Sequence, residues 1–212
     1  SIVRRDTGDS YQEFLTKLAK ESGIETPTRE DLARLDRKRA KKGSNDDWTH
    51  PYDPDARITK MKDGRTHLAH KTENAVDLET GAVVGVTLQP ADTGDTTTMI
   101  ETLITASEQV EIVLPQSEGI QEVVADKGYF STERIADMDQ IGLRSYVSEP
   151  KQKRRRWRGN KEAQAAVYAN RRRIRGKRGK ALLRRRGELL ERPFAHLYET
   201  GKMRRVYLRG SN

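Results

Sequence analysis

The sequence contains no cysteine in its 212 residues. This absence excludes disulfide bridges and thiolate metal sites, and it fits the reducing environment of the cytoplasm. Long apolar runs are also missing: no stretch approaches the roughly 20 apolar residues that a transmembrane helix needs, and the N-terminus has no signal-peptide pattern. We therefore expect a cytoplasmic protein that does not enter a membrane.

Apolar side chains are scarce, and acidic residues are fewer than basic ones. Hydrophobic residues make up 33% of the chain and charged residues 34%, with a net charge of +9. A chain of this length buries one sizeable core, so this core must be lean and the remaining segments polar. The positive charge favours a polyanionic partner, and nucleic acid is the first choice.

The most informative stretch is EVVADKGYFSTE, residues 122–133. Its apolar run predicts a short buried strand that ends at Asp126. Ser131 or Thr132 is expected to cap a helix with Ile135, Met138 and Ile141 on its inner face. A carboxylate at the carboxyl end of such a strand lies where open α/β sheets bind ligands. The alternative is that Asp126 only caps a turn.

Two helices are predicted near the N-terminus. Residues 10–22 form an amphipathic pattern that stops at Gly23, and a second helix follows a capping box from Thr28 to Asp31. The basic run 37–43 and the acidic, proline-containing run 44–54 come next. We interpret both runs as solvated surface.

Residues 65–89 predict a β-hairpin with Thr80 and Gly81 in its turn and Asp77 close to it. A helix follows, capped by Asp95 or Thr96. Asp92 and Asp95 could be metal ligands, but capping and loop roles are favoured because aspartate is common before helices. Residues 143–148 predict another strand.

Lysine and arginine occupy roughly half of residues 151–186, a density typical of nucleic-acid-binding proteins. Within this segment, residues 161–175 predict a helix and the run GKRGK predicts a break before the next one. We interpret Tyr168 as an anchor to the rest of the domain, whereas Trp157 could be an anchor or stack on a base. The candidate DNA-binding residues are Arg154, Arg155, Arg156, Arg158, Arg171, Arg172, Arg173, Lys177 and Arg178.

The last predicted helix covers residues 180–198 and contains Pro193, which should kink it or start its second half. Leu183, Leu190 and Phe194 share one face. Glu191 lies at the border of that face, where a glutamate is more often a surface residue than a ligand.

Three blocks, taken in order, resemble the DDE transposases of bacterial insertion sequences: NAVDLETGAVVGVTLQPADTGD, VVADKGYFS and GELLERPFAHLYETGKMRR. The resemblance covers most of the chain. It implies an α/β, RNase H-like fold that is partial, with the first catalytic strand apparently missing and a basic helical insertion. It divides the chain into an N-terminal helical and loop part (1–62), the RNase H-like core (63–150), the basic insertion (151–186) and the C-terminal part of the core (187–212).

The resemblance also implies the chemistry. Asp126 and Glu191 match the second and third acids of a triad that holds two Mg²⁺ ions, because this hard cation prefers carboxylate oxygens. The position of the first acid falls just before Ser1, and Asp77 matches the family's hairpin aspartate instead. Since the region after Asn212 is also expected to continue, we expect a chain that lacks both of its ends.

The function implied is that of a transposase fragment capable of Mg²⁺-dependent DNA cleavage and strand transfer, inactive as this chain alone. Its partners would be double-stranded DNA, both terminal repeats and target, and a second copy in a homodimer, in association with the nucleoid. The alternative is a non-enzymatic, basic DNA-binding protein. A basic RNA-associated protein is a third class, but no RNA-recognition motif is present.

Overall fold

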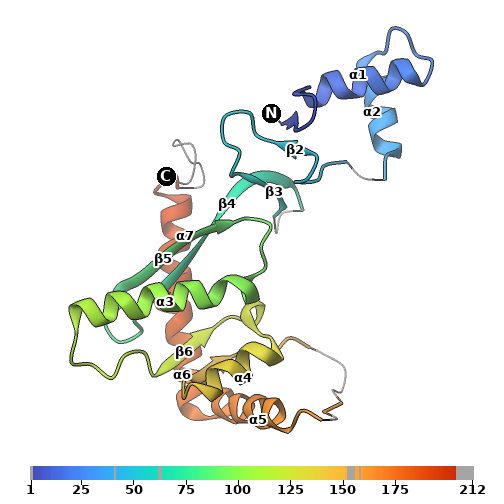
Figure 1. Cartoon of the computed structure of the whole chain (residues 1–212). Helices are drawn as coiled ribbons and strands as arrows, with labels where there is room; N and C mark the ends of the chain where they lie inside the picture. Colours follow the sequence, from blue (N-terminus) through green and yellow to red (C-terminus); the bar gives the residue numbers. More distant parts are fainter. Residues whose placement is uncertain (1, 41, 62–63, 152–155, 158, 204–212) are drawn as a thin grey trace. The chain divides into compact units, whose positions relative to one another are not determined.

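The computed structural model describes residues 2–40, 42–61, 64–151, 156–157 and 159–203. The chain forms two compact units. One contains the N-terminal part up to Lys71 together with Leu88–Asp92, and the other contains Thr72–Thr87 and the chain from Thr93 onward. Among the described residues, helices and three small sheets alternate along the sequence, which confirms the mixed α/β class (Figure 1).

Both predicted N-terminal helices are confirmed. Helix α1 covers Tyr11–Glu21 and helix α2 covers Arg29–Lys38, and each begins with a complete capping box, built by Ser10 with Glu13 and by Thr28 with Asp31. Leu15 and Ala19 of α1 are buried, as the amphipathic pattern predicts.

The interpretation of residues 44–54 as solvated surface is wrong at Trp48, which is 1% exposed. Trp48 lies in a two-residue strand, β2 (Trp48–Thr49), that pairs with β1 (Val3–Arg4). Its ring packs 5.0 Å from Tyr11 and 5.4 Å from Phe14 between centroids. The basic run is not purely solvated either, because the Arg39 guanidinium lies 4.8 Å from the Phe14 ring centroid.

The predicted hairpin is confirmed, with an additional strand beside it. The sheet has the order β3-β4-β5, with bounds Arg57–Lys60, Thr66–Val76 and Val83–Pro90. In the turn, Gly81 has a φ of +80° and its N–H donates to the Asp77 carbonyl at 2.8 Å. A side chain would strain this left-handed conformation, which explains the glycine.

Helix α3 (Asp95–Val113) packs closely on β5. A Cβ at Gly85 would lie 3.1 Å from the Ala106 Cβ, so glycine permits this approach. Thr87 of the same strand face is buried, whereas Val86 on the other face is 55% exposed. The small side chains of β5, and not its apolar ones, face the helix.

The predicted capping role of Asp95 is wrong. The N-cap of α3 is Gly94, and no side chain makes the cap hydrogen bond. The loop role of Asp92 is confirmed, because its Oδ2 accepts a hydrogen bond from Asn45 Nδ2 at 3.0 Å.

The predicted strand before Asp126 is β6 (Glu122–Ala125), and the next predicted strand is β7 (Arg144–Val147), which pairs with it in parallel. Helix α4 (Thr132–Gln140) connects them and is capped by Ser131, as predicted. Ile135 and Met138 are buried, but Ile141 is 77% exposed because the helix ends before it.

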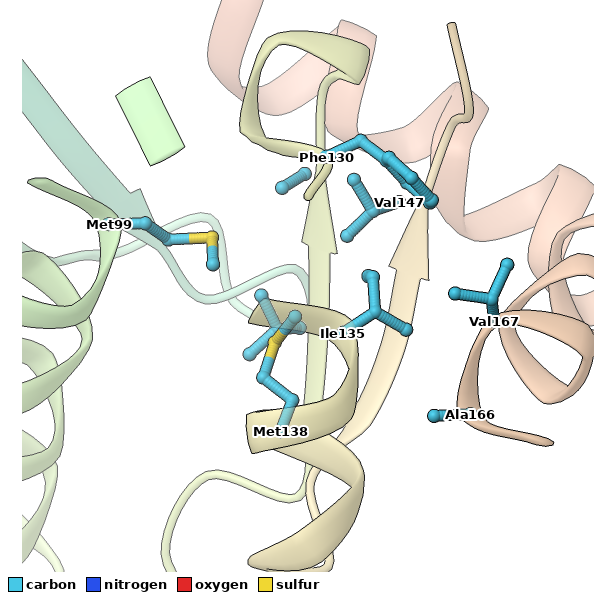
Figure 2. Close-up of a cluster of buried hydrophobic side chains, with 9 residues drawn as sticks. Met99, Phe130, Ile135, Met138, Val147, Ala166 and Val167 are labelled. Atoms are coloured by element: carbon cyan, nitrogen blue, oxygen red, sulfur yellow. The ribbon is translucent and has the colours of Figure 1, made fainter. Parts of the chain in front are cut away.

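Helix α5 (Lys161–Arg175) completes the core of the second unit, and its bounds confirm the predicted helix. Ala166 and Val167 join Ile135 of α4, Met99 of α3 and Val147 of β7 in one cluster, which Figure 2 shows around the two strands. Because this cluster is small, each of its members contributes a large share of the unit's apolar burial.

The last helical stretch has three parts. Helix α6 covers Lys177–Arg186, a π-helical turn, η2, covers Gly187–Glu191, and helix α7 covers Arg192–Glu199. The predicted break between the two helices is confirmed at Gly176, the first residue of GKRGK, whereas the other residues of this run already belong to α6. Pro193 is near the start of α7, as predicted. Within the described residues, no helix is both long and apolar enough to cross a bilayer.

Candidate active site

Asp126 directly follows β6 and serves as the N-cap of a short 3-10 helix, η1 (Lys127–Tyr129). Its Oδ1 accepts a hydrogen bond from the Lys127 N–H at 2.7 Å, and the residue is exposed. The two interpretations of Asp126 are therefore compatible: it caps a turn and also presents its carboxylate at the carboxyl end of a parallel strand, where α/β sheets bind ligands.

The helix that leads to Glu191 runs alongside β6. At the start of the strand, Arg178 Nη2 donates to Glu122 Oε2 at 2.6 Å. From there α6 rises roughly 12 Å to Arg186, and the strand advances roughly 13 Å to Asp126. Helix α6 therefore packs along the strand that ends at Asp126.

Glu191 ends the π-helical turn, and its Oε1 accepts a hydrogen bond from Arg186 Nη1 at 2.6 Å. Residues five apart in a regular α-helix point about 140° away from each other. The i→i+5 geometry of the π-helix brings them onto the same side, and such turns are frequent at functional sites. The Glu191 side chain is 59% exposed.

The β4–β5 hairpin also contacts the helical stretch that contains Glu191. Arg185 donates hydrogen bonds to the carbonyls of Leu78 and Glu79. Farther on, the Tyr198 hydroxyl lies 3.3 Å from Thr72 Oγ1. Glu191 lies between these two attachments, so the position of its backbone is set by β4 as well as by β6.

Asp77 has a structural role in the hairpin turn. Its Oδ2 accepts hydrogen bonds from the N–H and hydroxyl of Thr80, and its Oδ1 accepts from the Glu79 N–H. The bond from the Thr80 hydroxyl is the main reason that the pKa of the Asp77 carboxyl lies below its usual range. This geometry agrees with the predicted hairpin aspartate.

Sequence reasoning missed Glu73, a glutamate on β4 that is only 3% exposed. Its carboxylate accepts hydrogen bonds from Thr98 and Thr102 of α3. Burial, followed by the negative charges of Glu73 and Asp95, raises the pKa of the Tyr129 phenol well above its usual value. No local pattern marks Glu73, because its partners come from distant segments.

Asp95, predicted as a cap or a ligand, contacts the turn after Asp126. A Cβ at Gly128 would lie 2.6 Å from Asp95 Oδ2. This contact gives a physical reason for the glycine in the DKGY sequence, since any larger residue would displace the carboxylate or the turn.

A comparison with known protein families gives a match. The family model described as the transposase DDE domain matches residues 27–212. The chain belongs to this family. No curated protein and no solved structure matches it. The resemblance to DDE transposases is therefore confirmed, and membership of this family implies a DNA substrate.

Domains of the transposase DDE family generally depend on a divalent metal. Asp126 and Glu191 offer only carboxylate oxygens, which are the donors that hard cations such as Mg²⁺ prefer. In the part of the chain that the structure describes, no three His, Cys, Asp or Glu side chains are grouped so that they could hold a metal ion. The donor chemistry of each carboxylate fits a divalent cation.

In this DDE domain, several of the predicted DNA-binding cations have intramolecular partners. Arg171 pairs with Glu149 at 2.6 and 2.8 Å, Arg173 donates to the Ser145 carbonyl at 2.9 Å, and Arg178 pairs with Glu122. Arg156, Arg172 and Lys177 are exposed. Arg154, Arg155 and Arg158 lie outside the described residues.

The two aromatic residues of the basic segment lie near each other. Trp157 packs against the core cluster, and its ring centroid is 6.2 Å from that of Tyr168. Tyr168 is 40% exposed, with the Arg171 guanidinium 5.1 Å from its ring centroid. Of the two roles considered for Trp157, this packing favours the anchor.

Proposed function

We propose that this transposase DDE domain uses Asp126 and Glu191 to cleave DNA strands and transfer them in a metal-dependent reaction. The observation that carries the proposal is the packing of α6, which leads to Glu191, on β6, which ends at the exposed Asp126; the Glu122–Arg178 pair joins the two elements. The alternative, a non-enzymatic DNA-binding protein, is not favoured by the family match.

The two carboxylates would have different mobility. Asp126 is fixed by the strand before it and by its bond to the Lys127 N–H, so it presents a preset oxygen. Glu191 is paired with Arg186, whose side chain is only 14% exposed, whereas its own side chain is 59% exposed. The exposed Glu191 carboxylate would turn from this partner toward a bound cation. When bound, a pair of Mg²⁺ ions would supply charge neutralisation at the phosphodiester.

We propose an RNase H-like sheet in which a further strand, the one that carries the family's first acid, lies between β4 and β6. Within the described residues β6 pairs only with β7. Helix α3 contacts both sheets, since Thr102 bonds Glu73 of β4 while Met99 packs in the cluster of β6 and β7. One helix that covers both sheets supports a single layer with room for a strand.

We propose that DNA is bound through the exposed cations of α5 and α6, with Arg172 and Lys177 as the main phosphate contacts. Within the described residues, neither forms an ion pair with an acidic side chain as Arg171 and Arg178 do. Arg156 is exposed nearby in sequence, and roles for Arg154, Arg155 and Arg158 stay predictions. The homodimer, the nucleoid association and the four-part division of the chain also stay predictions.

The test is strand cleavage of a supercoiled plasmid that carries the terminal repeats, by a protein that contains this whole chain, in the presence of Mg²⁺ or Mn²⁺. We expect Asp126→Asn and Glu191→Gln each to abolish cleavage, because both substitutions keep the side-chain shape and remove the charge. Glu188→Gln is the matched control, since Glu188 is exposed on the same π-helical turn. Cleavage by either test variant at the rate of the control would refute the assignment.

A further inference from the structure

The start of α3 lies against the turn that follows Asp126. Asp95 is the first residue of this helix, and its Oδ2 would lie 2.6 Å from a Cβ placed on Gly128. The φ of Gly128 is not positive, so its backbone conformation would accept an L side chain. The Asp95 carboxylate is therefore what excludes a side chain at this position, and the two residues are in close contact.

Two further contacts join the start of α3 to the chain after Gly128. The Arg134 Nε, at the start of α4, donates to the Thr96 carbonyl at 3.1 Å. Phe130 is buried in the same hydrophobic cluster as Met99 (Figure 2). The start of α3 thus holds the chain that connects β6 to α4 at three points.

The orientation of the Asp126 carboxylate depends on this turn. Asp126 is the N-cap of η1, and its Oδ1 accepts a hydrogen bond from the Lys127 N–H at 2.7 Å. The Tyr129 N–H donates to the Asp126 carbonyl at 3.1 Å. Because both donors belong to the backbone on either side of Gly128, a shift of Gly128 would also turn the carboxylate.

We propose that Asp95 is a positioning residue for Asp126: through its contact with Gly128, it fixes the turn that directs the Asp126 carboxylate. The inference rests on the proposed function of Asp126. Within the described residues, no three His, Cys, Asp or Glu side chains are grouped so that they could hold a metal ion. Asp95 therefore acts through the turn and not as a third ligand beside Asp126 and Glu191.

The test is a double-mutant cycle of Gly128→Ala and Asp95→Ala. Gly128→Ala leaves every charge in place and forces either the carboxylate or the turn to move. Asp95→Ala removes the carboxylate, which leaves room for the methyl group in the double variant. Gly85→Ala is the matched control, since its methyl group would lie 3.1 Å from the Ala106 Cβ of the same helix. Ala106 is roughly 16 Å along α3 from Asp95.

The first measurement is amide hydrogen exchange, which does not depend on a metal. We expect the Lys127 and Tyr129 amides to exchange about tenfold faster in both single variants, in line with the loss of one hydrogen bond. In Gly85→Ala the turn should keep its native rates. Asp95→Ala creates no clash, so it decides the question even if Gly128→Ala does not fold. Native rates in the turn of either single variant, or equal acceleration in Gly85→Ala, would overturn the proposal.

The second measurement is Mn²⁺ affinity by electron paramagnetic resonance. Loss of the group that orients a metal ligand typically weakens binding about tenfold or more, and we expect this loss in Gly128→Ala although its charges are unchanged. The double variant should bind Mn²⁺ as Asp95→Ala does, whereas two losses that multiply would contradict the proposal. Asp126→Asn is measured in parallel. If Asp126→Asn binds Mn²⁺ normally, the proposed function fails, whereas the exchange rates still decide whether Asp95 fixes the turn.

Discussion

Asn170 pairs with the backbone of Val147 at two points: its Oδ1 accepts from the Val147 N–H at 3.0 Å, and its Nδ2 donates to the Val147 carbonyl at 2.8 Å. The amide imitates a neighbouring strand and satisfies the outer edge of β7. Arg173 extends this closure by donating to the Ser145 carbonyl at 2.9 Å. A sheet edge closed by side chains does not recruit another strand.

We expect Asn170→Ala to lower the free energy of unfolding of the second unit by on the order of 3 kcal/mol, because each buried polar group left unpaired costs about 1–3 kcal/mol. Chemical denaturation followed by circular dichroism measures the change. Asn160→Ala is the control, since Asn160 caps the exposed start of the same helix and its loss costs about 1 kcal/mol. Equal losses in the two variants would show that the Asn170–Val147 pair adds no more stability than an exposed helix cap.

The elements of this fold could be predicted because their signals are local. The apolar run before Asp126, the capping boxes at Ser10 and Thr28 and the turn at Gly81 each depend on a few consecutive residues. Trp48 could not be placed from its acidic surroundings, because the side chains that bury it belong to α1.

The residues of the candidate site also divide into those that the sequence predicted and those that it did not. Asp126 and Glu191 were predicted through a family resemblance, and family membership is now shown, although the roles of both residues stay proposals. Glu73 was missed because its hydrogen-bond partners, Thr98 and Thr102, are far from it in sequence. Because arginine is frequent throughout residues 151–186, the sequence alone did not show that Arg173 donates a hydrogen bond to β7.

The Glu122–Arg178 pair should make stability depend on pH. The bond from Arg178 is the largest cause that lowers the pKa of the Glu122 carboxyl below its ordinary value of 4.5. A depressed carboxyl pKa stabilises the folded state above the unfolded pKa, and this contribution is lost as the pH falls through the folded pKa. We expect Arg178→Gln to lower the stability slightly at pH 7, because solvent weakens an ion pair whose cation is exposed.

Denaturation curves from pH 7 to pH 3 provide the measurement for this pair. The difference in unfolding free energy between the wild type and Arg178→Gln should shrink as Glu122 becomes protonated. Lys180→Gln, on the exposed surface of the same helix, is the control and should show no such trend. A difference that stays constant down to pH 3 would mean that Arg178 does not stabilise the fold through Glu122.

DNA binding should depend on the exposed cations and not on the paired ones. Each phosphate contact contributes about −0.9 to the slope of log affinity against log salt for duplex DNA. We expect Arg172→Ala and Lys177→Ala each to flatten this slope by up to about one unit, equally for all sequences. Fluorescence anisotropy with a labelled duplex over a range of salt concentrations provides the slopes.

Arg171→Ala is the control for these slopes. The Arg171 guanidinium is held by Glu149, and the residue is next to Arg172 in the same helix. The slope of this variant should match that of the wild type. If Arg171→Ala flattened the slope while Arg172→Ala did not, the surface that binds DNA would lie elsewhere on α5.

The central claim is that Asp126 and Glu191 share a metal site, and the location of a bound cation tests it most directly. Two ions about 3.5–4 Å apart require the two carboxylates to lie about 4–8 Å from each other. A crystal structure of the chain with Mn²⁺, analysed by anomalous scattering, gives the position of the ion. We predict an anomalous peak coordinated by oxygens of both residues, with Glu191 released from Arg186. A peak elsewhere, or the two carboxylates on opposite faces of the sheet, would contradict the account.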